Sequence, residues 1–127
     1  MEKLSFTMEN YLEAIFELSN EESAYGARLT DIADRLSVTK STANSAMSSL
    51  AEKGLVKNGR YQHIVLTEEG RKLASTVARK HKTIQLFFIK YLKLNEDTAD
   101  SDACAIEHVI SEEAIEAMRR CLAEERA

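Results

Sequence analysis

The chain has 127 residues, of which 44% are hydrophobic and 30% charged, with no proline, four glycines and a formal net charge of −4. This content suffices for one or two small domains with a core, and the scarcity of proline and glycine favours long helices over turn-rich sheets. The longest apolar run in the middle of the chain, residues 86–89, is too short to span a membrane, and the N-terminus lacks a signal-peptide core. Two cysteines without a secretion signal predict a reduced, cytoplasmic protein with no membrane contact.

The charges are unevenly distributed along the chain. Residues 1–27 carry a net charge of −5, residues 28–93 carry +8, and residues 94–127 carry −7. A basic middle segment is the electrostatic pattern expected of a protein that contacts nucleic acid. The acidic ends are unsuited to DNA but form a reasonable environment for cations.

Residues 7–20 are predicted to form an amphipathic helix with Thr7 as its N-cap. Its apolar positions recur every three or four residues: Met8, Tyr11, Leu12, Ile15 and Phe16. Asn10 and Glu13, three residues apart, lie near the edge of this apolar stripe.

Two short helices around a tight turn are predicted next. The first covers residues 29–36 with Thr30 as its cap, and the second covers residues 40–53, capped by Thr39 and ended by Gly54. The inward face of the second helix is apolar: Ala43, Met47 and Leu50. Its outward face is small and polar: Lys40, Ser41, Thr42, Asn44, Ser45 and Ser48. This order predicts a helix-turn-helix, in which the second helix reads DNA.

A β-hairpin is predicted directly afterwards, over residues 55–66. Asn58-Gly59 is the strongest short hairpin signal, and β-forming residues flank it here. A helix-turn-helix followed by a hairpin is a winged helix. Lys57, Arg60 and His63 would place positive or titratable groups on the wing.

Three helices are predicted for the remainder. Thr67 caps a long helix that ends near Leu92, and two acidic helices follow at about 96–109 and 112–125, the last capped by Ser111. The long helix has an apolar stripe that also contains His81: Leu73, Val77, Ile84, Phe88 and Tyr91. Together with the stripe of the last helix, this is more apolar surface than so short a chain readily buries, which predicts a dimer.

Cys104, Glu107 and His108 are the strongest candidates for a metal site. Positions i, i+3 and i+4 share one helix face, so a thiolate, a carboxylate and an imidazole would point the same way. All three are ligand types for Fe²⁺, Mn²⁺, Co²⁺ and Zn²⁺. A further donor must come from elsewhere, and His81 is the obvious one. By itself, the same pattern also arises in an acidic helix with one cysteine and one histidine.

Three sequence blocks, in this order around a winged helix, resemble the diphtheria toxin repressor family of metal-dependent transcription regulators. They are YLEAIF at residues 11–16, RKH at 79–81 and CAIEHVIS at 104–111. The family has iron-dependent and manganese-dependent branches. The resemblance implies a homodimer built on the C-terminal helices and a metal site between the first helix and those helices.

The resemblance also implies roles for individual residues. It assigns the metal site to Asn10, Glu13, His81, Cys104, Glu107 and His108. Asp100 and Gln85 lie where some members complete a second metal position. The implied DNA contacts come from the wing, through Lys57 and Arg60, and from the recognition helix and its cap: Thr39, Lys40, Ser41, Thr42, Asn44 and Ser45.

The chain departs from the family pattern at several positions. Asn10 is a neutral oxygen donor where the iron branch typically has methionine and the manganese branch aspartate. Cys104 is similar to the iron branch, whereas Glu13 is similar to the manganese branch. Gln85 replaces an acid of the iron branch, which weakens the case for a second site. Because the chain ends at Ala127, the SH3-like third domain of longer members is expected to be absent.

The sequence therefore predicts a mainly α protein, with a winged helix-turn-helix DNA-binding domain at residues 1–70 and a helical dimerisation and metal-binding domain at residues 71–127. We expect a repressor and not an enzyme. A divalent ion would stabilise a homodimer that binds a palindromic operator in double-stranded DNA of metal-homeostasis genes, with no small organic substrate. The thiolate favours Fe²⁺ over Mn²⁺, and Zn²⁺, Co²⁺ or Ni²⁺ should substitute in vitro.

Three alternatives remain open at this point. A winged-helix regulator could sense no metal and use Cys104 or Cys121 as a redox switch. A small cysteine enzyme could use Cys104 and His108, although no glycine-rich oxyanion loop accompanies them. A metal-binding interaction module with a degenerate wing is the third alternative.

Overall fold

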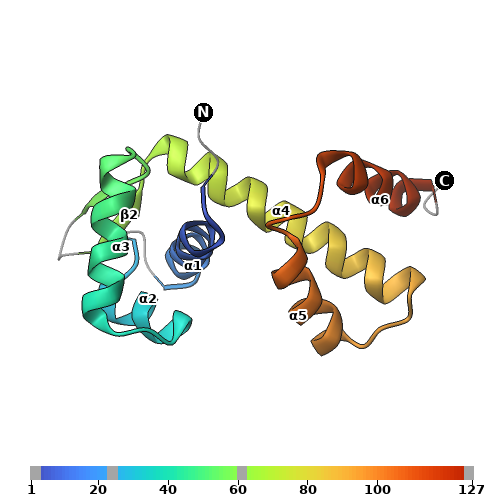
Figure 1. Cartoon of the computed structure of the whole chain (residues 1–127), viewed down its shortest axis with the longest axis horizontal. Coiled ribbons are helices and arrows are strands. Elements are labelled where there is room, and N and C mark those ends of the chain that lie inside the picture. Colours follow the sequence, from blue (N-terminus) through green and yellow to red (C-terminus); the bar gives the residue numbers. More distant parts are fainter. Residues whose placement is uncertain (1–3, 23–25, 60–62, 125–127) are drawn as a thin grey trace. The chain divides into compact units, whose positions relative to one another are not determined.

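A computed structural model describes residues 4–22, 26–59 and 63–124. This part of the chain is mainly helical, as predicted, and contains α1 (Phe6–Glu22), α2 (Leu29–Leu36), α3 (Lys40–Glu52), β1 (Val56–Asn58), β2 (Ile64–Leu66), α4 (Glu68–Tyr91), α5 (Glu96–Ile106) and α6 (Glu112–Glu124) (Figure 1). The chain divides into two compact units, Met1–Ser75 and Thr76–Ala127. None of the described helices is long and apolar enough to cross a membrane.

The N-terminal unit is organised around α1, which packs against α2, α3 and β2. Four fully buried aliphatic side chains form the centre of its core: Leu12, Ile15, Ile32 and Leu50. An ion pair on the surface, from Arg35 Nη1 to Glu17 Oε2 at 2.8 Å, also joins α2 to α1. The core therefore fixes the helix-turn-helix on the first helix.

The predicted helix-turn-helix is confirmed. Ser37 ends α2 in the left-handed conformation, with φ of 56°, and its N–H donates to the carbonyl oxygens of Ala33 and Asp34. Thr39 caps α3 as predicted, because its Oγ1 accepts from the N–H of Thr42 at 3.1 Å. The predicted inward residues of α3 are buried and the predicted outward residues are exposed.

The second helix has the predicted bounds, but two predicted N-caps, Thr7 and Thr30, are wrong. Helix α1 begins one residue before Thr7, and its cap is Ser5, whose Oγ accepts from the N–H of Met8 at 3.2 Å. Helix α2 begins at Leu29, so Thr30 lies inside the first turn, and the N-cap position belongs to Arg28, which makes no side-chain cap bond. In both helices the first turn starts one or two residues earlier than the cap signal indicated.

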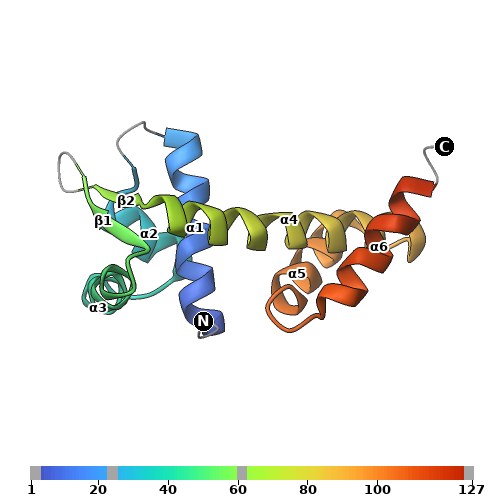
Figure 2. The same cartoon turned by 90° about the horizontal axis from the view of Figure 1, so that it is seen from above.

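The hairpin is confirmed, but Asn58-Gly59 does not form a two-residue turn in it. Strands β1 and β2 lie side by side (Figure 2). They are antiparallel, with Val56 opposite Leu66 and Asn58 opposite Ile64. Asn58 is therefore the last residue of β1 and Ile64 the first of β2. This register buries Val56, Ile64 and Leu66 together, which a two-residue turn would not do.

His63 does not lie on the wing surface as predicted, because only 8% of it is exposed. Lys57 is exposed, as predicted. Arg60 lies outside the described residues.

The C-terminal unit contains most of α4 together with α5 and α6. Its core is small: Ile84, Ala103 and Ile115 are fully buried, and Phe88, Ile106, Ile110 and Met118 pack against them. Thr67 and Ser111 cap α4 and α6 as predicted, through the N–H groups of Gly70 and Ala114. Helix α5 ends at Ile106 instead of near 109, because the N–H of Val109 bonds to the Ile106 carbonyl and tightens the last turn.

Gly70, in the first turn of α4, allows a close approach of two backbone segments. A Cβ atom at this position would lie 2.0 Å from the carbonyl oxygen of Leu55, whereas one at Gly54, where φ is +75°, would meet nothing within 4 Å. Gly70 therefore permits the contact between the start of α4 and the residue just before β1.

We expect Gly70→Ala to destabilise the protein by about 2–3 kcal/mol, because backbone must move to accommodate the methyl group. The matched control Gly54→Ala should cost only about 1 kcal/mol, from the left-handed conformation alone. Urea unfolding followed by circular dichroism measures both values. Equal midpoints for the two variants would contradict this packing argument.

Candidate metal centre and nucleic-acid interface

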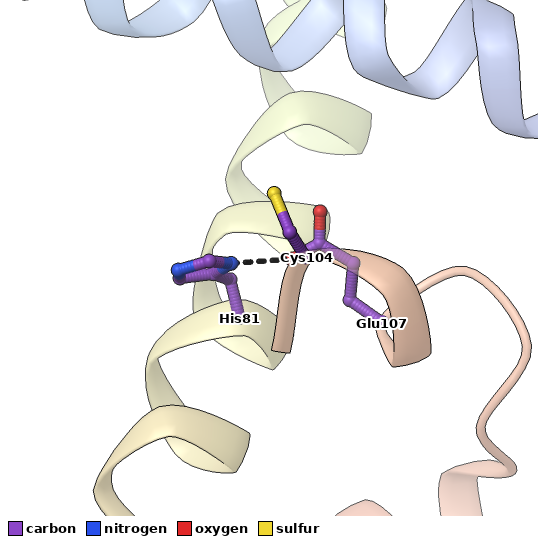
Figure 3. Close-up of side chains that lie close together, drawn as sticks. All are labelled: His81, Cys104 and Glu107. Carbon is purple, nitrogen blue, oxygen red and sulfur yellow. Dashed lines mark hydrogen bonds and ion pairs between the residues drawn. The ribbon is translucent and has the colours of Figure 1, made fainter. Parts of the chain in front are cut away.

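Three potential metal ligands from the C-terminal unit converge on one place. His81 comes from α4, Cys104 from α5, and Glu107 from the turn that directly follows α5 (Figure 3). One ligand atom of each residue lies within 4.8 Å of the others. Metal bonds of 2.0–2.3 Å allow two ligands of one ion to be at most about 4.6 Å apart, so small side-chain rotations suffice to close the set.

Glu107 is the most buried member of this cluster, with 1% of its surface exposed. His81 Nδ1 lies 2.8 Å from Glu107 Oε2. The other oxygen, Oε1, has no hydrogen-bond partner among the described residues, although His108 Nε2 is 3.3 Å away. The two observations are compatible, since a short distance without the right direction is not a hydrogen bond.

An unsatisfied buried carboxylate oxygen is costly, because it has lost water without gaining a donor. A divalent cation would satisfy Glu107 Oε1, and the neighbouring thiol and imidazole offer further electron pairs of the kinds that Fe²⁺, Co²⁺ and Zn²⁺ accept. The residues of the cluster therefore fit a transition-metal ion.

His81 contacts a carboxylate through each ring nitrogen. Besides Nδ1, its Nε2 lies 2.8 Å from Asp100 Oδ1. A carboxylate oxygen only accepts hydrogen bonds, so each of these contacts is a hydrogen bond when the ring nitrogen that makes it carries the hydrogen. The two carboxylates together fix the orientation of the ring between α5 and the turn after it.

The other predicted metal-site residues lie as follows. His108 is 6% exposed and lies beside Glu107, outside the group of three converging ligand atoms. Asn10 and Glu13 belong to α1 in the N-terminal unit, where Glu13 is buried and Asn10 half-buried. The structure thus brings together His81, Cys104 and Glu107 from the predicted set.

The contact of Asp100 with His81 is the feature that the sequence pattern missed. Asp100 lies one helical turn before Cys104, so a position on the same face of α5 was evident. Its partner was not evident, because α4 and α5 are brought together only by the small core of the C-terminal unit.

The candidate nucleic-acid interface lies on α3 and the wing. The outward residues of α3, together with its cap, form a continuous exposed set: Thr39, Lys40, Ser41, Thr42, Asn44, Ser45 and Ser48. Hydroxyl and amide groups of this kind can contact base edges and phosphates. Lys57 adds a positive charge on β1.

Two family models match the chain over nearly its whole length. Residues 3–64 match the iron dependent repressor N-terminal DNA binding domain, and residues 67–125 match the iron dependent repressor metal binding and dimerisation domain. The N-terminal winged helix-turn-helix is therefore the DNA-binding domain of the fold, and the C-terminal helices form the dimerisation and metal-binding domain.

Relatives and solved structures agree with this assignment. A helix-turn-helix-type transcriptional regulator of Methanocaldococcus jannaschii is 34% identical over 116 residues, which cover 91% of this chain and 92% of the relative. The iron-dependent repressor IdeR of Mycobacterium tuberculosis is 34% identical over 89% of this chain, which spans about half, 48%, of that protein. The solved structure of the manganese regulator SloR superposes with a TM-score of 0.79 at 28% identity, over 91% of this chain and 53% of SloR.

These relatives are transcription regulators and not enzymes, and they lend no support to a redox switch at Cys104 or Cys121. Iron-dependent and manganese-dependent regulators both occur among them. The matched domains, the shared fold and the converging metal ligands lead to one conclusion: this chain belongs to the diphtheria toxin repressor family of metal-dependent transcription regulators.

Proposed function

We propose that this chain is a metal-activated repressor whose homodimer binds a palindromic operator when a divalent ion, preferably Fe²⁺, occupies the cluster around Glu107. The observation that carries the proposal is the buried Glu107 carboxylate, with one unsatisfied oxygen, next to His81 and Cys104. A bound cation would give Glu107 Oε1 the partner that it lacks among the described residues. A buried carboxylate with donors to both of its oxygens would gain no such partner. We also propose a cytoplasmic location, as expected for a transcription regulator of this family.

His81, Cys104, Glu107 and His108 would hold the ion, with an oxygen from Asn10 or Glu13 as the additional ligand. When bound, the ion supplies positive charge and a fixed coordination geometry. The thiolate of Cys104 favours Fe²⁺ over Mn²⁺, since manganese prefers oxygen ligands. Zn²⁺, Co²⁺ and Ni²⁺ should bind at least as tightly in vitro, because affinity follows the Irving–Williams order.

Activation is a population shift. A ligand changes an equilibrium between two conformations only by its difference in affinity for them. The carboxylates of Asp100 and Glu107 each lie 2.8 Å from a nitrogen of His81, and a cation bound beside them would stabilise the conformation that brings these groups together. The conformation with a formed metal centre is the one that we assign to DNA binding.

The homodimer would present two recognition helices, each an α3, to half-sites about one helical turn of DNA apart. Large apolar side chains exposed on the C-terminal unit support this self-association. They are Leu86, Tyr91, Leu92 and Val109, which are between 38% and 60% exposed. Exposed apolar side chains of this size are expected where another chain covers the surface.

The metal preference is tested at Cys104. We expect Cys104→Glu to move activation towards Mn²⁺ by at least tenfold in the ratio of half-saturating Mn²⁺ to Fe²⁺, because the sulfur ligand is replaced by oxygen. DNA binding by fluorescence anisotropy under anaerobic conditions gives the ratio, with duplexes selected from a random library by the Fe²⁺-loaded protein. Cys121→Ser is the control and should leave the ratio unchanged. Wild-type protein activated by Mn²⁺ but not Fe²⁺ would overturn the preference, and full affinity in excess chelator would overturn metal activation.

The DNA-binding surface is tested by removing single charges. Lys57→Ala should weaken DNA binding by a similar factor for all duplexes. It should also reduce the slope of log affinity against log salt concentration by about one, the value expected for one lost phosphate contact. Arg120→Ala removes the same charge from an exposed position on α6 and should change neither value. Asn44→Ala should instead alter the order of preferred sequences. An unchanged salt dependence in Lys57→Ala would exclude the wing from the interface.

Self-association is tested at Val109, which is 60% exposed. Val109→Lys should weaken dimerisation at least tenfold without affecting folding, since the side chain has little of the monomer core around it. Thr98→Lys, at an exposed position on α5, is the matched control. Sedimentation equilibrium at micromolar concentration measures both variants, and a wild-type protein that stays monomeric with and without metal would refute the dimer.

A further inference from the structure

We propose that Asp100 is a positioning residue for the metal centre: it holds His81 by Nε2, so that Nδ1 faces the ion, and the centre takes one ion per chain. This inference rests on the proposed metal-dependent function. It assigns Asp100 a different role from that of a ligand to a second ion.

The two contacts of His81 define the orientation of its ring. Nε2 lies 2.8 Å from Asp100 Oδ1, and Nδ1 lies 2.8 Å from Glu107 Oε2. Only the Nδ1 edge of the ring therefore faces the buried carboxylate. Among the described residues, the converging ligand set contains His81, Cys104 and Glu107 but not Asp100.

A histidine that binds a metal through one nitrogen commonly donates the N–H of its other nitrogen to a carboxylate, which fixes both the tautomer and the ring orientation. In this chain Asp100 is placed to receive that hydrogen bond. While Nε2 keeps its hydrogen for Asp100, the electron pair of a neutral imidazole is on Nδ1. The Asp100 carboxylate thus selects the tautomer that can bind an ion next to Glu107.

The same hydrogen bond argues against a second ion held by His81, Asp100 and Gln85. Such an ion could bind Nε2 only by replacing the contact between Nε2 and Asp100 Oδ1. Gln85 contributes only a neutral amide, and the Asp100 side chain is 60% exposed, so this position lacks the buried charged ligands of a closed site. A half-exposed carboxylate is, however, sufficient to orient a ring by one hydrogen bond.

The size of the effect follows from this geometry. Removal of a carboxylate that accepts a hydrogen bond from a metal-binding histidine usually lowers metal affinity by about 10- to 100-fold. Because solvent screens an exposed carboxylate, we expect about tenfold for Asp100→Ala. Asp100→Asn should lose less than about threefold, since its amide oxygen still accepts from Nε2–H.

The experiment uses the full chain and Co²⁺ as the probe. Absorption titrations report affinity, stoichiometry and, through the sulfur-to-cobalt band, the bond to Cys104. We expect one Co²⁺ per chain in the wild type, in Asp100→Ala and in Asp100→Asn, with the affinities given above and the same sulfur band. Ser101→Ala, at the neighbouring exposed position, is the matched control and should be silent.

A second readout follows the tautomer directly. With diamagnetic Zn²⁺ bound, ¹⁵N NMR of the His81 side chain should show a protonated Nε2 in the wild type and in Asp100→Asn. The Nε2–H signal should broaden by exchange with water in Asp100→Ala. A merely structural role of Asp100 would leave this signal unchanged.

The possible failures are distinguishable. Two ions per chain in the wild type, with one lost in Asp100→Ala, would overturn the inference and leave metal activation standing. Equal losses in Asp100→Ala and Asp100→Asn would also overturn it, because charge and not the hydrogen bond would then matter. No Co²⁺ binding by the wild type would overturn the proposed function itself.

Discussion

The carboxylate of Glu107 lies where water barely reaches it, and the C-terminal unit is arranged around this constraint. One of its oxygens faces the His81 ring, while the other faces no correctly directed donor among the described residues. Burying a charge is favourable only when a partner compensates for the lost hydration. The partner of Glu107 is the ring of His81, from the middle of α4, and Cys104 of α5 lies close to both. All three side chains are also of types that bind metal ions.

The sequence predicted this cluster only in part. Cys104 and Glu107 share a face because their spacing matches the helical repeat, so their proximity is a local property. His81 is far away in the chain, and its approach depends on how Ile84 and Ile115 pack, which no local pattern encodes. His108 shows the limit of the local argument, because α5 ends at Ile106 and the turn places His108 beside Glu107, outside the converging set.

The DNA-binding unit was predicted more completely, since its signals are mainly local. Thr39 and Gly54 mark the ends of α3, and alternation between apolar and polar positions identifies its two faces. The errors arose where tertiary packing decides between local options. The Asn58-Gly59 hairpin signal was overridden by a register that buries Val56 opposite Leu66, and His63, just before β2, is buried as well.

Strand β2 has neighbours on both sides. It pairs with β1, and the backbone of Ile64 also exchanges two hydrogen bonds, of 2.7 and 2.9 Å, with Ala27. Within the described residues, β1 is then the remaining open edge of the sheet, and it is three residues long with Lys57 exposed. Unpaired strand edges are templates for accidental joining of one chain to another, and a short, charged edge is a poor template. A protein that must associate in pairs through its helices is thereby protected from growing into larger aggregates through its wing.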